Sequence, residues 1–205
     1  VGSEMCIRDR HAHGVHILFD NKVILGTRAR KTHTKSFNAF KSIDFPEIAI
    51  VRDRRVRYYI EEKVSEDGPD FYTSLDPKVF VLRLVPGMNP DIFSFLKDHY
   101  DGLVIESFGV GGIPCYDNES FVDAVADWIA CGKALVMTTQ VPHEGSDMSV
   151  YMVGQVIKKK YRLIEAYDMT TEAIVAKLMW ILAQTKKPAE VREMFYRPVQ
   201  NDLNI

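Results

Sequence analysis

After residue 76 the sequence alternates between short apolar runs of strand length and longer amphipathic segments of helix length. The strand-like runs cover residues 78–87, 102–108 and 134–139, and a segment that can form a helix follows each of them. This alternation is typical of βαβ units, in which right-handed crossovers join parallel strands. We therefore expect residues 77–205 to form a Rossmann-like α/β domain, with a parallel sheet flanked by helices.

Capping residues predict where several of these helices begin and end. Asn89 with Pro90, Thr170 and Pro188 are signals for helix starts, and Gly132 is a signal for a helix end. Residues 148–158 can form a further helix, capped by Ser146 or Asp147.

The first part of the chain has the pattern of antiparallel strands. Two runs rich in β-branched and aromatic residues flank an Asp-Asn-Lys turn, which predicts a hairpin over residues 14–31, and residues 48–51 form another short apolar run. The stretch 52–76 is charged and rich in turn residues, so we take 56–76 as a linker. Residues 1–10 lack periodicity and do not begin with methionine, so we expect an artefact or a disordered edge there and exclude it from the fold.

Composition excludes several classes of protein. With 46% hydrophobic and 26% charged residues the chain is of globular type. A net charge of −2 and a pI near 6.3 argue against a nucleic-acid binder. No apolar run approaches the roughly 20 residues that cross a bilayer, so we expect no membrane span. The three cysteines are odd in number and lack Cys-x-x-Cys spacing, which favours a reducing cytosol.

Two loops at the predicted carboxyl ends of strands are candidates for a binding site, because ligands of α/β sheets gather there. Residues 109–114 form a glycine-rich loop, in which Pro114 replaces the third glycine of the dinucleotide fingerprint. A tight turn is therefore favoured over nucleotide binding. Residues 143–147 contain an imidazole, two carboxylates and a hydroxyl, which suit acid/base or metal chemistry, but helix capping explains them more simply. The chain has no His-x-x-x-His or Cys-x-x-Cys pair that would bind zinc.

A basic cluster ends the predicted hairpin, at Arg28, Arg30, Lys31 and Lys35. Its simplest interpretation is a solvated strand end. The functional alternative is that one lysine, withdrawn from water beside a carboxylate, relays a proton and activates a hydroxyl nucleophile. Catalysis by Cys115 or Cys131 is less attractive, because neither has a histidine partner nearby in sequence.

Four separate stretches together resemble the later part of bacterial-type, cytoplasmic L-asparaginases. They are GVHILFDNKVILGTRARKTHTKSFNAFKSIDFP, VIESFGVGGIP, VMTTQVPHEGSDMSVYMVG and AYDMTTEAIVAKLMWIL, in the order and spacing of that family. The resemblance implies that residues 11–55 end a larger amino-terminal domain, of which the hairpin is a remnant, and that 77–205 form the carboxyl-terminal domain. It also implies hydrolysis of L-asparagine to L-aspartate and ammonia by a threonine nucleophile, without cofactor or metal, in a homodimer or homotetramer.

The same resemblance assigns site residues. Lys31, in the pattern Gly-Thr-Arg-Ala-Arg-Lys-Thr, matches the family's catalytic lysine. Gly111 and Gly112 match the loop that reaches a neighbouring subunit's active site, although many relatives carry asparagine where Gly112 stands. Glu144 is a weaker candidate for binding the substrate's amino group. Glu106 and Val141 replace the arginine and cysteine of allosterically controlled relatives, so we do not expect such control.

The departures from the family are as informative. Neither a Gly-Thr-Ile segment nor a Thr-Asp-Thr segment occurs in the chain, so both threonine elements are missing. We expect the chain to be the distal part of an asparaginase and to be inactive alone, with further sequence upstream. The alternatives are a nonenzymatic assembly or binding module that keeps the fold, and a nucleotide-binding module.

Overall fold

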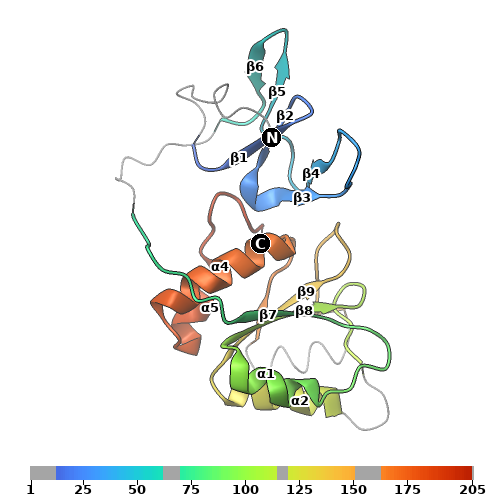
Figure 1. The fold of residues 1–205 in the computed structure, drawn as a ribbon, viewed down its shortest axis with the longest axis vertical. Coiled ribbons are helices and arrows are strands. Elements are labelled where there is room, and N and C mark those ends of the chain that lie inside the picture. Colours follow the sequence, from blue (N-terminus) through green and yellow to red (C-terminus); the bar gives the residue numbers. More distant parts are fainter. Residues whose placement is uncertain (1–12, 62–69, 115–119, 151–162, 205) are drawn as a thin grey trace. The chain divides into compact units, whose positions relative to one another are not determined.

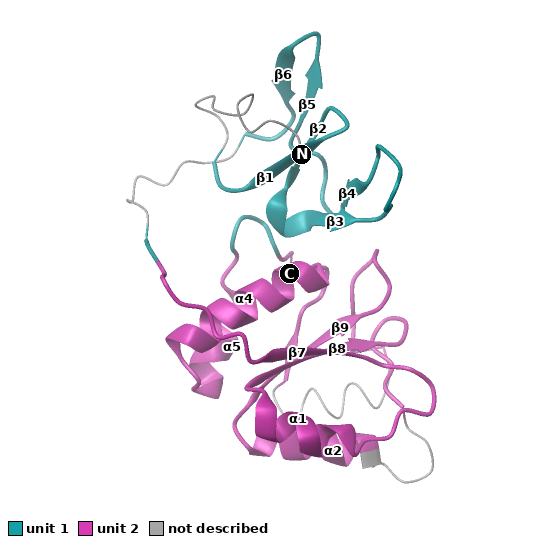
Figure 2. Ribbon diagram, in the orientation of Figure 1, with its two compact units in different colours: residues 1–71, 199–202 teal, residues 72–198, 203–205 magenta. Residues whose placement is uncertain are grey.

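The chain forms two compact units in the computed structural model (Figure 2). The structure describes residues 13–61, 70–114, 120–150 and 163–204. Unit 1 comprises residues 1–71 and 199–202, and unit 2 comprises residues 72–198 and 203–205. Residues 1–10, which the sequence excludes from the fold, lie outside the described residues.

Unit 1 is built around a four-stranded antiparallel sheet with the order β1-β2-β5-β6 (Figure 1). Its strands are β1 (His16–Phe19), β2 (Lys22–Leu25), β5 (Ala49–Arg52) and β6 (Arg55–Tyr58). The predicted hairpin is present, and its turn residues Asp20 and Asn21 have φ of 50° and 60°. Such positive φ values suit short polar residues and produce the tight turn that twisted strands require.

The second arm of this hairpin is interrupted, which the sequence did not indicate. β2 ends at Leu25, a 3-10 turn η2 (Gly26–Arg28) follows, and a separate strand β3 (Ala29–Lys31) pairs with β4 (Phe40–Ser42). Strand β6 is a second difference, because it occupies residues 56–58 of the segment assigned to a linker. Its alternating Arg-Val-Arg-Tyr pattern is short, but β6 pairs with β5, which satisfies the backbone groups on one side of this edge strand.

Unit 2 contains a parallel sheet with the order β10-β9-β8-β7. Its strands are β7 (Val79–Arg83), β8 (Gly102–Ser107), β9 (Ala134–Thr139) and β10 (Ile164–Glu165). Its helices are α1 (Ile92–His99), α2 (Ser120–Ala130), α4 (Thr171–Gln184) and α5 (Pro188–Tyr196). Figure 1 shows α1 and α2 on one face of this sheet and α4 with α5 on the other. The predicted α/β class with its parallel sheet and flanking helices is confirmed.

The two faces of the parallel sheet have separate cores. Leu103 and Ile105 of β8 pack with the side of α1 and α2, whereas Val104 between them packs with the side of α4 and α5. This follows from the alternation of side chains along a strand. All six residues of β8 are buried, which explains its nearly continuous apolar sequence.

Most helix boundaries agree with the capping signals. Thr170 Oγ1 accepts a hydrogen bond from the Ala173 amide at 3.2 Å, Pro188 opens α5, and Gly132 with φ of 74° follows α2. The exception is α1, which begins at Ile92. Asn89 Oδ1 accepts from the Asp91 amide at 2.9 Å, so it caps a turn that precedes the helix.

The expected helix over residues 148–158 falls mostly outside the described residues, which omit 151–158. Met148 and Ser149, at its expected start, form a turn. Among the helices that the structure describes, none is long and apolar enough to cross a membrane.

Candidate functional site

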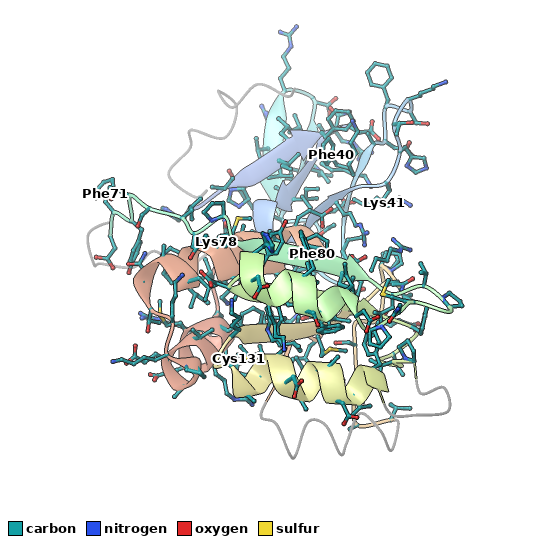
Figure 3. All side chains as sticks on the ribbon, turned by 60° about the horizontal axis from the view of Figure 1, so that its bottom comes forward. Phe40, Lys41, Phe71, Lys78, Phe80 and Cys131 are labelled. Atoms are coloured by element: carbon teal, nitrogen blue, oxygen red, sulfur yellow. The ribbon has the colours of Figure 1, made fainter. Side chains whose placement is uncertain are left out.

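Lys31 is the last residue of β3 in unit 1. It lies opposite Phe40 in the register of β3 and β4, and its side chain is exposed (Figure 3 shows Phe40 and Lys41 of β4). Within the described part of the chain Lys31 forms no ion pair. A lysine that relays a proton needs a carboxylate beside it and shelter from water. The described residues of unit 1 give Lys31 neither a carboxylate partner nor shelter from water.

The glycine-rich loop after β8 closes on itself. The amides of Gly111 and Gly112 both donate to the carbonyl oxygen of Phe108, at 3.1 and 2.7 Å, and the Phe108 amide donates back to Gly112 at 2.9 Å. Gly111 has φ of 148°, and a Cβ on it would lie 3.2 Å from Cγ of Met148. The loop is thus a tight turn. Its two candidate amides already have an acceptor, so no phosphate cradle is formed.

The residues at the end of β9 hold the carboxyl ends of the neighbouring strands together. Thr139 Oγ1 donates to the Gly109 carbonyl and accepts from the Val141 amide at 3.0 Å. Gln140 Nε2 donates to the carbonyls of Leu84 and Glu106, at 2.6 and 3.1 Å. The ends of β7, β8 and β9 are therefore held together by two side chains. In the sequence, Thr139 and Gln140 are visible only as two polar residues that follow an apolar strand. This pattern indicates that no ribose-binding acid lies there, but it does not predict the hydrogen bonds.

The two candidate loops of unit 2 are joined to each other. The Asp147 amide donates to the Val110 carbonyl at 2.7 Å, so Gly111, Gly112 and Glu144 all lie on loops at one edge of the sheet. Glu144 is exposed and has φ of 73°. A left-handed backbone costs an ordinary residue about 1–2 kcal/mol relative to glycine. The structure thus brings together the three candidates of unit 2, while Lys31 belongs to unit 1.

Residues 143–147 support the capping interpretation. Asp147 Oδ1 accepts from the amide of Ser149 at 2.9 Å and from its hydroxyl. The Ser146 amide donates to the Tyr167 carbonyl at 2.9 Å. Among the described residues no group of three His, Cys, Asp or Glu side chains could hold a metal ion.

Two buried glutamates lie at the same edge of unit 2. Glu106 accepts from Thr171 Oγ1 at 2.7 Å and lies 3.8 Å from Nη1 of Arg83. Glu165 accepts from the Met148 amide at 2.7 Å. Both acids therefore hold neighbouring segments in place. In the sequence, each of these glutamates is a single acidic residue in an otherwise apolar strand, a pattern that could have indicated a buried and hydrogen-bonded carboxylate.

A cavity of about 750 Å³ lies elsewhere in unit 2, where β9 and β10 begin. Its two cations serve the fold. Lys133 Nζ donates to the carbonyls of Lys97 and Tyr100, at 2.7 and 2.6 Å, and Arg192 Nη1 donates to the Leu163 carbonyl at 2.7 Å. This cavity is remote from the loops that carry the candidate residues.

Known protein families match both units. Residues 78–195 match the glutaminase/asparaginase C-terminal domain, and residues 3–64 match the asparaginase N-terminal domain. The L-asparaginase of Thermococcus kodakarensis is 36% identical over 190 residues, which cover 93% of this chain and 57% of that protein. The chain thus spans somewhat more than half the length of this relative.

Other relatives have a different name. A glutamyl-tRNA(Gln) amidotransferase polypeptide of Thermofilum pendens, one of the subunits of that enzyme, is 34% identical over 174 residues. The match covers 83% of this chain and 38% of that polypeptide.

Solved structures give the same assignment. The thermostable L-asparaginase from Thermococcus kodakarensis superposes with a TM-score of 0.91 at 34% identity, covering 98% of this chain and 60% of that one. L-asparaginase I of Vibrio cholerae superposes with a TM-score of 0.79 at 23% identity, over 93% of this chain and 57% of that one, which supports the fold alone.

Proposed function

Because the chain belongs to the asparaginase family, we propose that it forms part of an amidohydrolase site that converts L-asparagine and water to L-aspartate and ammonia. The observation that carries the proposal is Lys31, which ends β3 in an exposed position within the family's Gly-Thr-Arg-Ala-Arg-Lys-Thr pattern. Because Lys31 is exposed at the end of a strand, other segments that carry a nucleophile and a carboxylate can reach its side chain.

Lys31 acts as the proton relay in this proposal. A threonine hydroxyl attacks the side-chain amide carbon, and its proton passes by way of Lys31 to the departing nitrogen, which leaves as ammonia. Water then hydrolyses the threonyl ester, which releases aspartate and returns the proton to the threonine. No metal or cofactor enters these steps.

The 205-residue chain does not catalyse this reaction alone in our proposal. Two facts support this: the sequence contains neither a Gly-Thr-Ile nor a Thr-Asp-Thr segment, and no carboxylate of the described residues forms an ion pair with Lys31. The lysine then has no nucleophile to activate. Gly111, Gly112 and Glu144 remain candidates for substrate contact, with Glu144 facing the amino group. For the two glycines this requires their loop to release the Phe108 carbonyl.

The test compares the chain with a joined protein. In the joined protein, the part of the Thermococcus asparaginase that precedes its matched region is fused in front of this chain. We expect no ammonia release from asparagine by the chain alone and measurable release by the joined protein. Activity of the chain alone, abolished by Lys31→Ala, would refute the proposed inactivity.

Three variants of the joined protein test the role of Lys31. Lys31→Ala should lower kcat by about 10²–10⁴-fold, the usual range for an acid–base group. Lys31→Arg should be equally impaired, because arginine keeps the charge but does not release its proton. Lys35→Ala, which removes another exposed lysine of the same segment, is the control. Full activity of Lys31→Arg would show that only the charge is needed.

A second function is favoured by the amidotransferase relatives. In it the same site would release ammonia as one component of a larger amidotransferase, with a protein partner. Release of ammonia from free glutamine, with free asparagine inert in the joined protein, would support this second function and contradict the first.

The proposal includes a cytoplasmic homodimer or homotetramer. Cys131, at the end of α2, is exposed and not in a disulfide, as expected in a reducing compartment (Figure 3). Light scattering of the purified protein measures the oligomer, and a monomer at micromolar concentration would contradict this part.

A further inference from the structure

A short segment near the end of the chain is part of unit 1. Residues 199–202 belong to unit 1, although the residues before and after them belong to unit 2. Gln200 and Asn201 both have left-handed backbones, with φ of 48° and 53°. They form a turn whose two backbone carbonyl groups and the Gln200 side chain all form hydrogen bonds with residues between 13 and 28.

The Gln200 side chain bonds to the backbone just before β1. Its Oε1 accepts from the Val15 amide at 3.2 Å, and its Nε2 donates to the His13 carbonyl at 3.0 Å. Gly14 lies between these two partners. A Cβ on Gly14 would lie 2.1 Å from Gln200 Nε2, so the side chain occupies the space that glycine leaves. The side-chain amide of Gln200 thus forms the two hydrogen bonds that a backbone residue of a neighbouring strand would form.

The two carbonyl groups of the turn hold η2. Thr27 Oγ1 donates to the Gln200 carbonyl at 2.9 Å, and Arg28 Nε donates to the Asn201 carbonyl at 2.6 Å. Arg28 is fully buried, and its guanidinium lies 5.4 Å from the centre of the Phe45 ring. A charged donor that is withdrawn from water depends strongly on such acceptors.

This contact is directly connected to Lys31. The turn η2 ends at Arg28, and β3 begins at the next residue and ends at Lys31. The partner of β3 is β4, with three residue pairs, so β3 has little pairing of its own to fix its position. The Arg28 carbonyl accepts from the amide of Ile43, the residue after β4, at 2.9 Å, so Arg28 connects the turn at 199–202 to the end of β4.

We propose that Gln200 and Asn201 are positioning residues for Lys31 and act through Thr27 and Arg28. The turn at residues 199–202 fixes η2, and η2 fixes the start of the three-residue strand that ends at Lys31. This inference rests on the proposed function for the role of Lys31. It adds that a segment 173 residues away in sequence from η2 is needed for the reaction.

Hydrogen exchange of the 205-residue chain tests the positional part. Thr27→Val removes the donor to Gln200, and Thr27→Ser keeps it. We expect the Ile43 amide to exchange about fivefold faster in Thr27→Val, the factor for one lost hydrogen bond, and to recover in Thr27→Ser. The Val51 amide, which donates to Asn21 at 2.8 Å in the same unit, reports on the whole of unit 1 and should not change. Equal acceleration at Ile43 and Val51 would show general destabilisation and overturn the proposal.

Kinetics of the joined protein test the functional part. We expect Thr27→Val and Gln200→Ala to lower kcat about tenfold with KM unchanged, because small displacements of a reacting group have large effects on rate. Thr27→Ser should restore kcat. Gln184→Ala removes an exposed glutamine of α4 and is the matched control.

The outcomes separate the two proposals. Unchanged kcat in Lys31→Ala would refute the proposed role of Lys31. Low kcat in Lys31→Ala with unchanged kcat in both Thr27→Val and Gln200→Ala would refute only the positioning role.

Discussion

The two units of this protein differ in how much of their sequence is used for a core. Among the residues that the structure describes, both faces of the parallel sheet of unit 2 are covered, and each face has a cluster of thirteen buried apolar residues. In unit 1 the corresponding cluster contains four, Val23, Leu25, Ile48 and Ala49. Burial of apolar surface is the main favourable term in folding. Unit 2 therefore holds most of the stability, while the residue with the most specific functional assignment, Lys31, lies in unit 1.

The units also differ in how they use cations. In unit 2, Lys133 and Lys177 donate to backbone carbonyls at helix ends, and Lys186 joins two carboxylates. In unit 1 the buried cation, Arg28, donates to a turn from the other end of the chain. The comparison teaches that the lysines of unit 2 join residues 20 to 110 positions apart in sequence, whereas Arg28 of unit 1 depends on an acceptor 173 positions away.

Proteolysis should show the largest difference between the units. We expect trypsin to cut first in unit 1, at exposed sites such as Arg54, Arg57 or Lys41, and to leave a resistant product that begins near residue 76. Phe71, which is 85% exposed, ends the first segment of unit 1 and lies shortly before the expected start of the resistant product (Figure 3). Mass spectrometry of the time course gives the cut sites. Cleavage at equal rates in both units would contradict the comparison.

Core truncation in unit 2 should have the next largest effect. Phe93 is 2% exposed and meets Phe121 edge to face at 5.2 Å. Phe93→Ala should lower the free energy of unfolding of unit 2 by about 3–5 kcal/mol. Phe95→Ala on the same helix removes a side chain that is 56% exposed and should change it by less than about 0.5 kcal/mol. Urea unfolding followed by tryptophan fluorescence is the measurement.

Two glycines sharpen the comparison inside unit 2. Gly145 has φ of 67°, and a Cβ there would lie 2.7 Å from the Tyr167 carbonyl oxygen. Gly132 has φ of 74° with no atom within 4 Å of such a Cβ. Gly145→Ala should therefore cost about 2–3 kcal/mol and Gly132→Ala about 1 kcal/mol. Thermal unfolding of both variants tests this order, and equal losses would show that the close approach to Tyr167 is unimportant.

The ion network of unit 2 should have the smallest effect, and one that depends on pH. Lys186 pairs with Asp76 at 2.9 Å and with Asp101. Burial raises the pKa of Asp76, but hydrogen bonds from Lys186 and the Lys78 amide, with the Lys186 charge, outweigh this and lower it. The pKa of Asp101 is lowered chiefly by the Lys186 hydrogen bond. Carboxyls with lowered folded-state pKa values stabilise the fold above their unfolded pKa values, and this is lost as pH falls through the folded values.

Lys186→Met should accordingly cost up to about 1 kcal/mol at pH 7, a value limited by the exposure of Lys186. The loss should shrink as the pH falls below 3.8, the usual pKa of both carboxyls, and vanish once both are protonated in the folded protein. Urea unfolding at pH 7 and at pH 2.5 measures both values. Lys78→Met removes another exposed lysine of unit 2, one whose ammonium forms no ion pair with the described residues, and is the control. A loss as large at pH 2.5 as at pH 7 would have to come from packing of the lysine stem.

Local sequence patterns predicted unit 2 better than unit 1. Continuous apolar runs and the signals at Thr170, Pro188 and Gly132 are local, so they could be read without knowing the fold. In unit 1, the turn η2 that interrupts the hairpin forms hydrogen bonds through Thr27 and Arg28 to residues far away in sequence. No window of sequence contains both partners, so no local pattern could reveal them.

The candidate site was predictable to different degrees. The resemblance pointed to Lys31 because a whole pattern surrounds it. The hydrogen bonds of Thr139 and Gln140 could not be predicted, because their acceptors are backbone carbonyls of neighbouring strands, which the sequence does not identify. The roles of Gln200 and Asn201 had no signal in sequence at all.

The return of residues 199–202 to unit 1 has a consequence for how the protein is made. A ribosome adds about 5–20 residues per second, so the 173 residues between η2 and its acceptors take on the order of 9–35 s to synthesise. During that interval the parallel strands of unit 2 can pair in the order in which they emerge, because neighbours in the sheet are neighbours in sequence. The segment that carries Lys31 must wait, with the Arg28 guanidinium lacking the Asn201 carbonyl, until residues 200 and 201 have been synthesised.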